Sequence, residues 1–336
     1  MSEEKSFNDL TVCDAKGYYK PFKYPWAFEA YKIQNQMHWL PDEVPLHDDV
    51  KDWKLKLSEA ERNLLTQLFR FFTTGDVDVG QAYIDKYMPI FRNEEIRMML
   101  SAITAMESTH AHAYSLLLDT VGMPEVEYQA FKQYAEMAAK HDYVAHFNVG
   151  SEADVAKSLA VVSAFTEGLQ LFSTFAILMN FARGDLSRGA RMKGMTQIVT
   201  WSIRDESLHV ESLMKLFHAY IEERPHLWTP ALKNEIGAIC ATMVDLEDSF
   251  IDLAFQQGGI DGLTPDEVKS YIRFIADRRM QGLGLDAPYQ VQKNPLPWLD
   301  HILNGVEHAN FFENRATEYA KGAWTGSWAD VWAQAA

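Results

Sequence analysis

Apolar residues recur every three or four positions through most of this chain, which is the spacing of one face of an α-helix. Alternating runs of β-branched residues and Asn-Gly or Asp-Gly turns, the usual signals of β-hairpins, are scarce. The pattern therefore predicts an all-α fold. The expected helices cover residues 24–37, 58–87, 93–121, 151 or 158 to 184, 195–220, 231–257, 265–284 and 298–321.

Several expected helix ends carry local signals. Ser58-Glu-Ala-Glu61 has the spacing of a capping box, in which the serine and the glutamate side chains accept hydrogen bonds from first-turn backbone amides. Gly122 and Pro124 follow the third helix, and both residue types commonly end helices. Gly189 to Gly194 interrupt the helical period again, so we expect a loop there.

The two ends of the chain differ from its body. Residues 1–25 show no helical period, and the last dozen residues combine Gly322 and Gly326 with scattered Trp and Ala. We expect a flexible N-terminal segment (1–25), one helical domain (26–320) and a flexible C-terminal tail (321–336).

Composition narrows the class of protein. The 336 residues are 47% hydrophobic, which allows a large core, and the formal net charge of −16 argues against nucleic-acid binding. The two cysteines, Cys13 and Cys240, are far apart, which excludes a disulfide framework and a Cys-ligated zinc site. The sequence begins without an apolar signal segment, so we expect a cytoplasmic protein.

Residues 159–181 are apolar enough to resemble a membrane span. Glu167 and Gln170 lie within this stretch, and an ionisable residue in such a helix usually faces a protein interior and has a function. We therefore expect a buried core helix and no membrane association.

The pattern Glu-x-x-His occurs twice within expected helices, at Glu107-Ser-Thr-His110 and Glu206-Ser-Leu-His209. Helical residues three apart share a face, so each pair presents a carboxylate and an imidazole together. Two such pairs, with one carboxylate from each of two further helices, form the ligand set of a dinuclear metal centre in a four-helix bundle. A third match, Glu223-Arg-Pro-His226, contains a proline that a helix interior does not tolerate, and we attribute it to chance.

Two other helices can supply the remaining carboxylates. Glu167 lies in a helix that is apolar on every side, so its carboxylate needs a cation, a proton or hydrogen bonds. A protonated or locally paired core glutamate is the simpler explanation, although glutamate is rarely fully buried. Asp76 and Asp78 are both candidates in an earlier helix, on faces about 200° apart. Spacing alone does not choose between them.

The ligand chemistry indicates which metal would bind. Four carboxylates balance the charge of two divalent ions, and carboxylate and imidazole ligands without sulfur suit iron or manganese. Tyr114 follows His110 by one helical turn on the same face, so it is a candidate one-electron donor to such a centre. The alternative is an ordinary core tyrosine with a hydrogen-bonded hydroxyl.

These motifs together make the chain resemble the small, radical-generating subunit of class I ribonucleotide reductases, over roughly residues 24–320. The segments that carry the resemblance are Met37–Val44, Phe71–Asp76, Met106–Tyr114, Phe165–Glu167, Arg204–His209, Arg279–Leu285, Asn294–Trp298 and Phe311–Arg315. The resemblance implies a ferritin-like helical bundle, a homodimer, and a dimetal centre with two ligand sets. The implied ligands are Asp76, Glu107 and His110 for one ion, and Glu167, Glu206 and His209 for the other.

The resemblance also implies a route for a radical. A stable radical would reside on Tyr114, and Asp205 would link the ligand His110 to Trp39. Transfer would continue through Trp39 and Tyr319 to a separate large subunit, which the C-terminal tail contacts and in which ribonucleotides are reduced to deoxyribonucleotides. The chain departs from the family in a longer loop near residues 184–194 and in Leu171, which occupies a position where an aromatic residue is frequent.

Several alternatives stay open. Two iron ions are the expected cofactor; two manganese ions are the alternative, with a flavoprotein activator as a further partner. A competing function is an oxidase on the same bundle that acts on a fatty-acid-like ligand, and a second is an iron-storage or structural helical protein without a radical. The sequence does not indicate the phosphorylation level of the nucleotide or its allosteric control, which belong to the partner.

Overall fold

The computed structural model describes residues 5–145, 147–256 and 258–303. Internal contacts divide the chain into two compact units, residues 1–295 and 296–336. The described residues contain an isolated bridge between Ile260 and Leu263 and otherwise no β-structure, so the predicted all-α fold is confirmed. Residues 297–303 are helical, and the rest of the helix expected over 298–321 lies outside the described residues, as do Tyr319 and the tail at 321–336.

The helices of the first unit follow one another without an intervening strand in the described residues. The α-helices are α1 (Pro25–Gln36), α2 (His47–Lys51), α3 (Glu59–Ala82), α4 (Met88–Ile90), α5 (Glu94–Val121), α6 (Ala135–Ala145), α7 (Glu152–Ala160), α8 (Leu171–Met179), α9 (Lys193–Glu222), α10 (Pro230–Phe255) and α11 (Pro265–Gly282). The 3₁₀ segments are η1 (Phe7–Asp9), η2 (Pro41–Glu43), η5 (Glu125–Gln133), η7 (Asn180–Ala182) and η8 (Pro225–Leu227). The π-helical segments are η3 (Asp52–Lys56), η4 (Tyr83–Tyr87) and η6 (Val161–Gln170).

The helix ends follow the local sequence signals. Ser58 Oγ accepts the Glu61 amide (3.2 Å), and Glu61 Oε2 accepts the Ser58 amide (2.7 Å), which completes the predicted capping box of α3. Gly122 ends α5 in the left-handed conformation (φ 81°), which glycine adopts without strain. Ser151, rather than Ser158, caps α7.

The sequence pattern missed two features of this fold. The α6 helix was not predicted, because alanines form much of its apolar content and leave only a weak helical period. The single long helix expected to carry Glu167 is a continuous run of α7, η6 and α8, and its middle third is π-helical. A wider π-turn places side chains at angles that a 3.6-residue period does not give.

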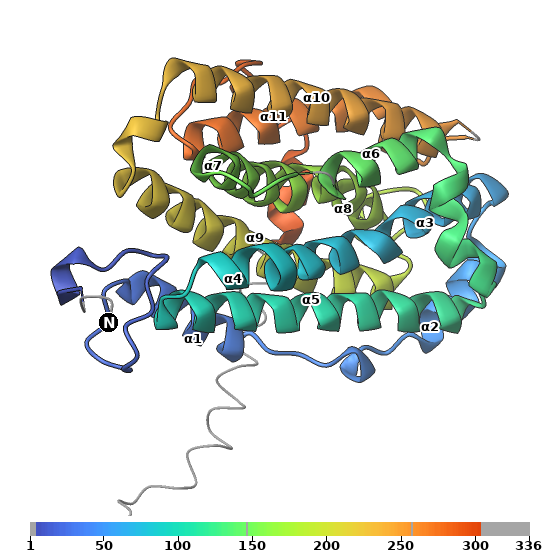
Figure 1. Ribbon diagram of the computed structural model, residues 1–336. Coiled ribbons are helices and arrows are strands. Elements are labelled where there is room, and N and C mark those ends of the chain that lie inside the picture. The colour runs from blue at the N-terminus through green and yellow to red at the C-terminus, as the bar shows by residue number, and fades with distance from the viewer. Residues whose placement is uncertain (1–4, 146, 257, 304–336) are drawn as a thin grey trace, which may run out of the picture. The chain divides into compact units, whose positions relative to one another are not determined.

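Four helical segments form the bundle that positions the candidate site. The long α3 lies along α5, and η6 lies against α9 (Figure 1). The α10 and α11 helices pack against each other and against η6, while α1 packs across α5 and α9. These contacts cover most of the inner faces of α3, α5, η6 and α9.

The apolar run Glu152–Ala182 is long and apolar enough to cross a membrane by length and composition alone. Every residue of its most apolar window is buried inside the described structure. Its apolarity is explained by its place in the core, between α9, α10 and α11.

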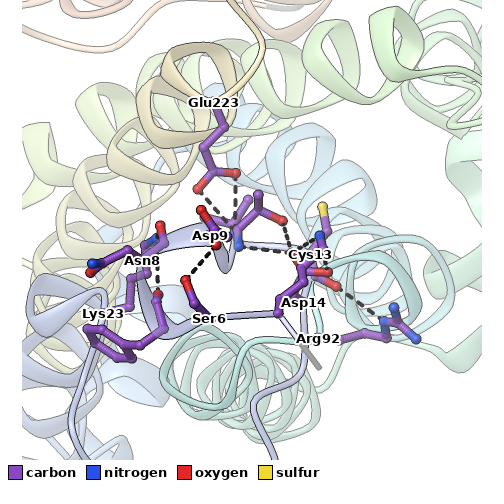
Figure 2. A network of polar contacts seen from close by, with 12 residues as sticks. Ser6, Asn8, Asp9, Cys13, Asp14, Lys23, Arg92 and Glu223 are labelled. Carbon is purple, nitrogen blue, oxygen red and sulfur yellow. Dashed lines mark hydrogen bonds and ion pairs between the residues drawn. The ribbon is translucent and has the colours of Figure 1, made fainter. Parts of the chain in front are cut away.

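The N-terminal segment has little regular structure but makes specific polar contacts (Figure 2). Glu223, directly after α9, accepts the Val12 amide (3.1 Å), Arg92 donates through Nε to the Cys13 carbonyl (3.2 Å), and Lys23 Nζ donates to the Asn8 carbonyl (2.5 Å). The contacts of Glu223 and Arg92 connect the described part of residues 1–25 to the helical body, and the Lys23 contact lies within the segment. The flexibility expected of this segment stays a prediction.

Polar contacts also fix the loop before α9. Arg188 and Arg191 both pair with the carboxylate of Glu61, at 2.5 and 2.7 Å, so the loop is attached to the first turn of α3. The Asp49 carboxylate accepts the amides of Gly194 (2.9 Å) and Met195 (2.8 Å) at the start of α9. The loop near residues 184–194 is therefore anchored at Arg188 and Arg191, and α9 has a fixed starting point.

Candidate metal centre

Six acidic and imidazole side chains from four helical segments converge inside the bundle. They are Asp76 from α3, Glu107 and His110 from α5, Glu167 from η6, and Glu206 and His209 from α9. Each is at most 3% exposed. They form two groups, in each of which the potential ligand atoms lie within 4.8 Å of one another. Glu107 and Glu206 belong to both groups, so either group could draw on these two carboxylates to hold an ion.

Each of these six side chains has a buried polar atom without a well-formed hydrogen bond in the described residues, although some of these atoms approach one another within the cluster, as His209 Nδ1 and Glu107 Oε1 do at 2.9 Å. These atoms are Asp76 Oδ2, Glu107 Oε1, His110 Nδ1, Glu167 Oε2, Glu206 Oε2 and His209 Nδ1. Buried polar atoms are nearly always paired, so six such atoms in one cluster need a common explanation. Two cations between the groups would satisfy them, and four carboxylates with two imidazoles suit iron or manganese. The residues present therefore fit a dinuclear metal site.

The structure also separates the two aspartates that spacing left open. Asp76 lies in the cluster, whereas Asp78 pairs with Nδ1 of His141 on α6 and is half-buried near the surface. The α6 helix, which the sequence pattern missed, thus supplies the partner of the second aspartate.

Hydrogen bonds outside the cluster orient both imidazoles. His110 Nε2 lies 3.3 Å from Asp205 Oδ2, and His209 Nε2 lies 3.0 Å from Gln34 Oε1 on α1. Each contact favours a proton on Nε2 and leaves Nδ1 available to a metal, which is the usual role of such outer partners. Trp39 Nε1 donates to the same Asp205 oxygen (2.8 Å), so Trp39, Asp205 and His110 form one connected path.

Glu167 is held by groups that the sequence analysis did not identify. The hydroxyl of Tyr83, fully buried in η4, donates to Glu167 Oε1. Arg279 of α11 donates through Nε to the carbonyl of Gly168 (2.8 Å), next to Glu167 in the π-helical segment. A sequence signal for Tyr83 exists, because it follows Asp76 by two helical turns and so shares its face.

Tyr114 is buried beside the cluster, at 1% exposure. Its hydroxyl donates to Ser202 Oγ of α9 (3.0 Å). Burial, and then the negative charge of Asp76, raise the pKa of the Tyr114 phenol, so it stays protonated at neutral pH. Ser202 is a further residue that the sequence analysis missed, since nothing in its spacing relates it to Tyr114.

The protonation of the metal-free cluster follows from its crowding. Burial, and then neighbouring carboxylates, raise the pKa values of Asp76 and Glu167 well above their usual range. Burial lowers the pKa values of His110 and His209, but hydrogen bonds to carboxylates prevail and raise both. Burial opposes ionisation of Glu107, yet hydrogen bonds from the two histidines lower its pKa to about 2. Without a metal, protons therefore supply the positive charge that the cluster needs.

The helical bundle and its converging side chains define a ferritin-like protein with a dinuclear, carboxylate-rich metal site. A family model described as "Ribonucleotide reductase, small chain" matches residues 17–295. The chain belongs to this family.

Known relatives agree with that assignment. The chain is 40% identical to a probable ribonucleoside-diphosphate reductase small subunit of Invertebrate iridescent virus 6, over 96% of this chain and 99% of the relative. The ribonucleotide reductase R2 subunit from Clostridium botulinum has a similar structure (TM-score 0.80, 21% identity, 88% of this chain and 94% of that one). A second similar structure is the dimanganese(II) NrdF protein of Streptococcus sanguinis (TM-score 0.69, 21% identity, 81% and 95% covered).

Proposed function

We propose that this chain is the small subunit of a ribonucleoside-diphosphate reductase, in which a dimetal centre and Tyr114 generate and store a radical for a large catalytic subunit. The observation that carries the proposal is the convergence of six buried carboxylate and imidazole side chains, whose potential ligand atoms form two groups within 4.8 Å, beside a buried tyrosine. Membership of the family supplies the reaction class.

The proposed mechanism assigns distinct tasks to the residues of this chain. Two redox-active ions, when bound, would supply the one-electron oxidation of Tyr114 by dioxygen. The bundle excludes water from the phenol, so that a radical there would be protected from solvent reductants. The Tyr114 hydroxyl donates its proton toward Ser202 Oγ, which fixes the orientation of the phenol. Asp205 and Gln34 hold the two imidazoles with Nδ1 facing the cluster.

Trp39 and Asp205 are proposed to carry the radical out of the bundle. Trp39 is buried, and its indole donates to Asp205, which contacts the ligand His110. The Trp39 ring also packs against Trp201, with centroids 5.0 Å apart. The further step through Tyr319 is proposed from the family resemblance, since this residue lies outside the described residues.

Family membership also indicates the assembly, a homodimer that works with a large ribonucleotide reductase subunit. We propose two iron ions as the cofactor. Two manganese ions are the alternative, because the ligand atoms suit both metals and one structural neighbour is described as a dimanganese(II) protein. With manganese, a flavoprotein activator is a further proposed partner. The proposed location is the cytoplasm.

The competing oxidase would need an apolar cavity large enough for a fatty-acid-like ligand, on the order of 300 Å³ or more. In the described residues, the apolar cavity between α3, α6 and η6 measures about 20 Å³. A groove of about 440 Å³ between α3 and α5 reaches Asp76 and Glu107, but it is open to the surface and does not enclose a ligand. The cavities therefore favour the reductase function.

Electron paramagnetic resonance tests the radical assignment directly. The wild-type chain, loaded with iron(II) and exposed to dioxygen, should show a tyrosyl signal, and Tyr114→Phe should abolish it. Tyr128→Phe is the matched control. Tyr128 lies in η5, and its hydroxyl donates to Asp119 (2.9 Å), which is not a residue of the cluster. The tyrosyl signal of this variant should equal that of the wild type. Absence of a tyrosyl signal from the wild-type protein, or an undiminished signal in Tyr114→Phe, would refute the assignment.

A further inference from the structure

Trp201 of α9 is a second indole beside Trp39, and the proposed mechanism does not use it. Two aromatic rings of the described residues contact Trp39. One is the buried imidazole of His110, with centroids 6.0 Å apart, and the other is Trp201, with centroids 5.0 Å apart and planes inclined by 48°. Trp39 is 3% exposed, whereas Trp201 is partly exposed. Trp201 therefore lies between the protein surface and a buried ring of the proposed radical path.

The helical period of α9 brings both Trp201 and Asp205 to Trp39. These two residues are four apart on α9, so their side chains share a face, one turn from each other. Asp205 Oδ2 accepts a hydrogen bond from Trp39 Nε1 (2.8 Å), and Trp201 contacts the Trp39 ring itself. Arg204 donates through Nη2 to the Met37 carbonyl (2.6 Å), which holds the loop that carries Trp39 against the same helix. Trp39 is thus fixed between a carboxylate and a second indole.

These contacts form a continuous row from the surface to the candidate metal centre. Trp201 contacts Trp39, and Trp39 reaches the ligand His110 both by its ring and through Asp205. Electron transfer slows steeply as donor and acceptor separate, so rings in contact exchange electrons far faster than rings divided by aliphatic side chains. The alternative is a purely structural pair, since tilted aromatic pairs are common in protein cores.

The proposed function leaves one electron unaccounted for. Conversion of one dioxygen molecule and four protons into two water molecules takes four electrons. Oxidation of two iron(II) ions to iron(III) supplies two electrons, and oxidation of Tyr114 supplies one electron together with one of the protons. The fourth electron must therefore come from a reductant outside the protein. The six candidate ligands are at most 3% exposed, so this electron needs a path inward from the surface.

We propose that Trp201 is the residue at which a small soluble one-electron reductant delivers this fourth electron. Trp39 passes an electron inward, Trp201 replaces it, and the reductant restores Trp201. Both indoles return to their starting state, and the reductant is oxidised by one electron. The proposal rests on the proposed function for its physiological meaning. Electron exchange between Trp201 and a soluble molecule does not depend on it.

The metal-free protein tests the step at the surface. The chain is labelled with fluorotryptophan, and a photoexcited flavin dye in solution serves as the one-electron partner. Reversible electron transfer to the dye polarises the fluorine resonance of each indole that reacts, and nuclear magnetic resonance detects this polarisation. The resonance that Trp201→Phe removes should be polarised in the wild type, because Trp201 is partly exposed. Absence of polarisation at Trp201 would overturn the proposal.

The loaded protein tests the step inward. Iron(II)-loaded protein is mixed with dioxygen and N,N,N′,N′-tetramethyl-p-phenylenediamine, an uncharged one-electron reductant whose oxidised form is blue. In the wild type, one blue cation should form for each Tyr114 radical, at a rate proportional to the reductant concentration. In Trp201→Phe this rate should fall several-fold, while the bound iron(II) stays unchanged.

Matched variants separate electron transfer from packing. Trp53 is a partly exposed indole in η3 that packs against Phe69 (centroids 6.3 Å apart), so Trp53→Phe should keep the wild-type rate. Trp201→Tyr has nearly the volume of Trp201→Phe but an oxidisable ring, and it should recover part of the rate. Trp39→Phe should slow the reaction as Trp201→Phe does, and the double variant should lose no more, because both residues lie on one path.

The outcomes distinguish the proposal from its alternatives. A wild-type rate in Trp201→Phe would overturn it and would indicate entry through the open groove that reaches Asp76 and Glu107. Equal rates in Trp201→Phe and Trp201→Tyr, or a slower rate with an equal loss of bound iron(II), would show a structural role and also overturn it. A wild type that forms no tyrosyl radical would refute the proposed function instead, and the polarisation of Trp201 in the metal-free protein would still decide its electron exchange.

Discussion

Tyr83 and Tyr87 lie one turn apart in η4, and both are fully buried, but their hydroxyls have different partners. Tyr83 donates to the cluster residue Glu167, whereas Tyr87 shares a hydrogen bond with Ser158 Oγ (2.9 Å). The Tyr83 contact engages one oxygen of Glu167 and leaves Oε2 unpaired toward the cluster. At the scale of single residues, the site thus depends on neighbours that hold each ligand by its other atom.

Removal of the Tyr83 hydroxyl should weaken metal binding. In Tyr83→Phe we expect a loss of affinity of about tenfold, the lower end of the range for outer partners of metal ligands. We also expect a stability loss of about 1–3 kcal/mol, because a buried carboxyl loses its hydrogen bond. Titration against a competing chelator measures the affinity, and urea unfolding measures the stability.

Tyr87→Phe is the control for that experiment, since it removes an equally buried hydroxyl without contact to the cluster. It should lose stability and keep the wild-type affinity for metal. The same loss of affinity in both variants would show that Tyr83 contributes only to packing.

The π-helical segment η6 is the element on which the position of Glu167 depends. The backbone carbonyl of Gly168 in η6 accepts a hydrogen bond from Arg279 Nε. Arg279 can approach this closely because Gly168 has no side chain. An added methyl group on Gly168 would lie 2.8 Å from Arg279 Nε and 2.8 Å from the Ser163 carbonyl. Burial lowers the pKa of Arg279 to about 10, which still leaves it charged at neutral pH.

Gly168→Ala should therefore disturb this element. We expect destabilisation of about 1–3 kcal/mol from overpacking, with weaker metal binding because Glu167 is the adjacent residue. Gly237→Ala, an equally helical position with room for a methyl group, should be neutral or gain up to about 1 kcal/mol. Urea unfolding compares the two variants, and equal stability would contradict the proposed packing at Gly168.

The whole molecule encloses four carboxylates, which are part of the formal net charge of −16. The helices that cover the bundle prevent water from screening these charges, so protons or metal ions must compensate them. Metal ions that bind only the folded state stabilise it by mass action, by about 2.7 kcal/mol at a hundred times the dissociation constant. Folding and metal loading are thus coupled across the molecule.

The stabilisation by metal should depend on pH. The folded-state pKa values of Asp76 and Glu167 are raised above the ordinary 3.8 and 4.5, and those of His110 and His209 above 6.5. Groups with raised pKa values contribute stability at low pH and lose that contribution as pH rises through the folded value. The metal-free fold should therefore weaken as the pH rises above the ordinary carboxyl pKa values, and further as it rises above 6.5, and metal binding should remove this loss.

Thermal unfolding with and without manganese(II), under anaerobic conditions, measures that effect. The increase in melting temperature should grow with pH in the wild type and in Glu211→Gln, an exposed position on α9. It should largely disappear in Glu206→Gln, which removes a shared carboxylate of the cluster. A metal effect that is independent of pH would contradict the protonation described for the cluster.

Local sequence determined most of the helices and the two Glu-x-x-His pairs. Helical periodicity, capping residues such as Ser58 and end signals such as Gly122 act within one or two turns, so they can be identified without knowledge of the fold. The same holds for a carboxylate and an imidazole three residues apart. The six candidate ligands and Tyr114 could therefore be named from the sequence, with the family resemblance selecting Asp76 over Asp78.

Tertiary structure decided everything that depends on how the helices pack against one another. Packing pairs Asp78 with His141 on the unpredicted α6, and it brings Gln34, Tyr83 and Ser202 to the cluster from separate elements. It also leaves a cavity where Leu171 faces a glycine. These partners are distant in sequence, so no local pattern relates them; only the packed core brings them within the few ångströms at which hydrogen bonds and contacts form.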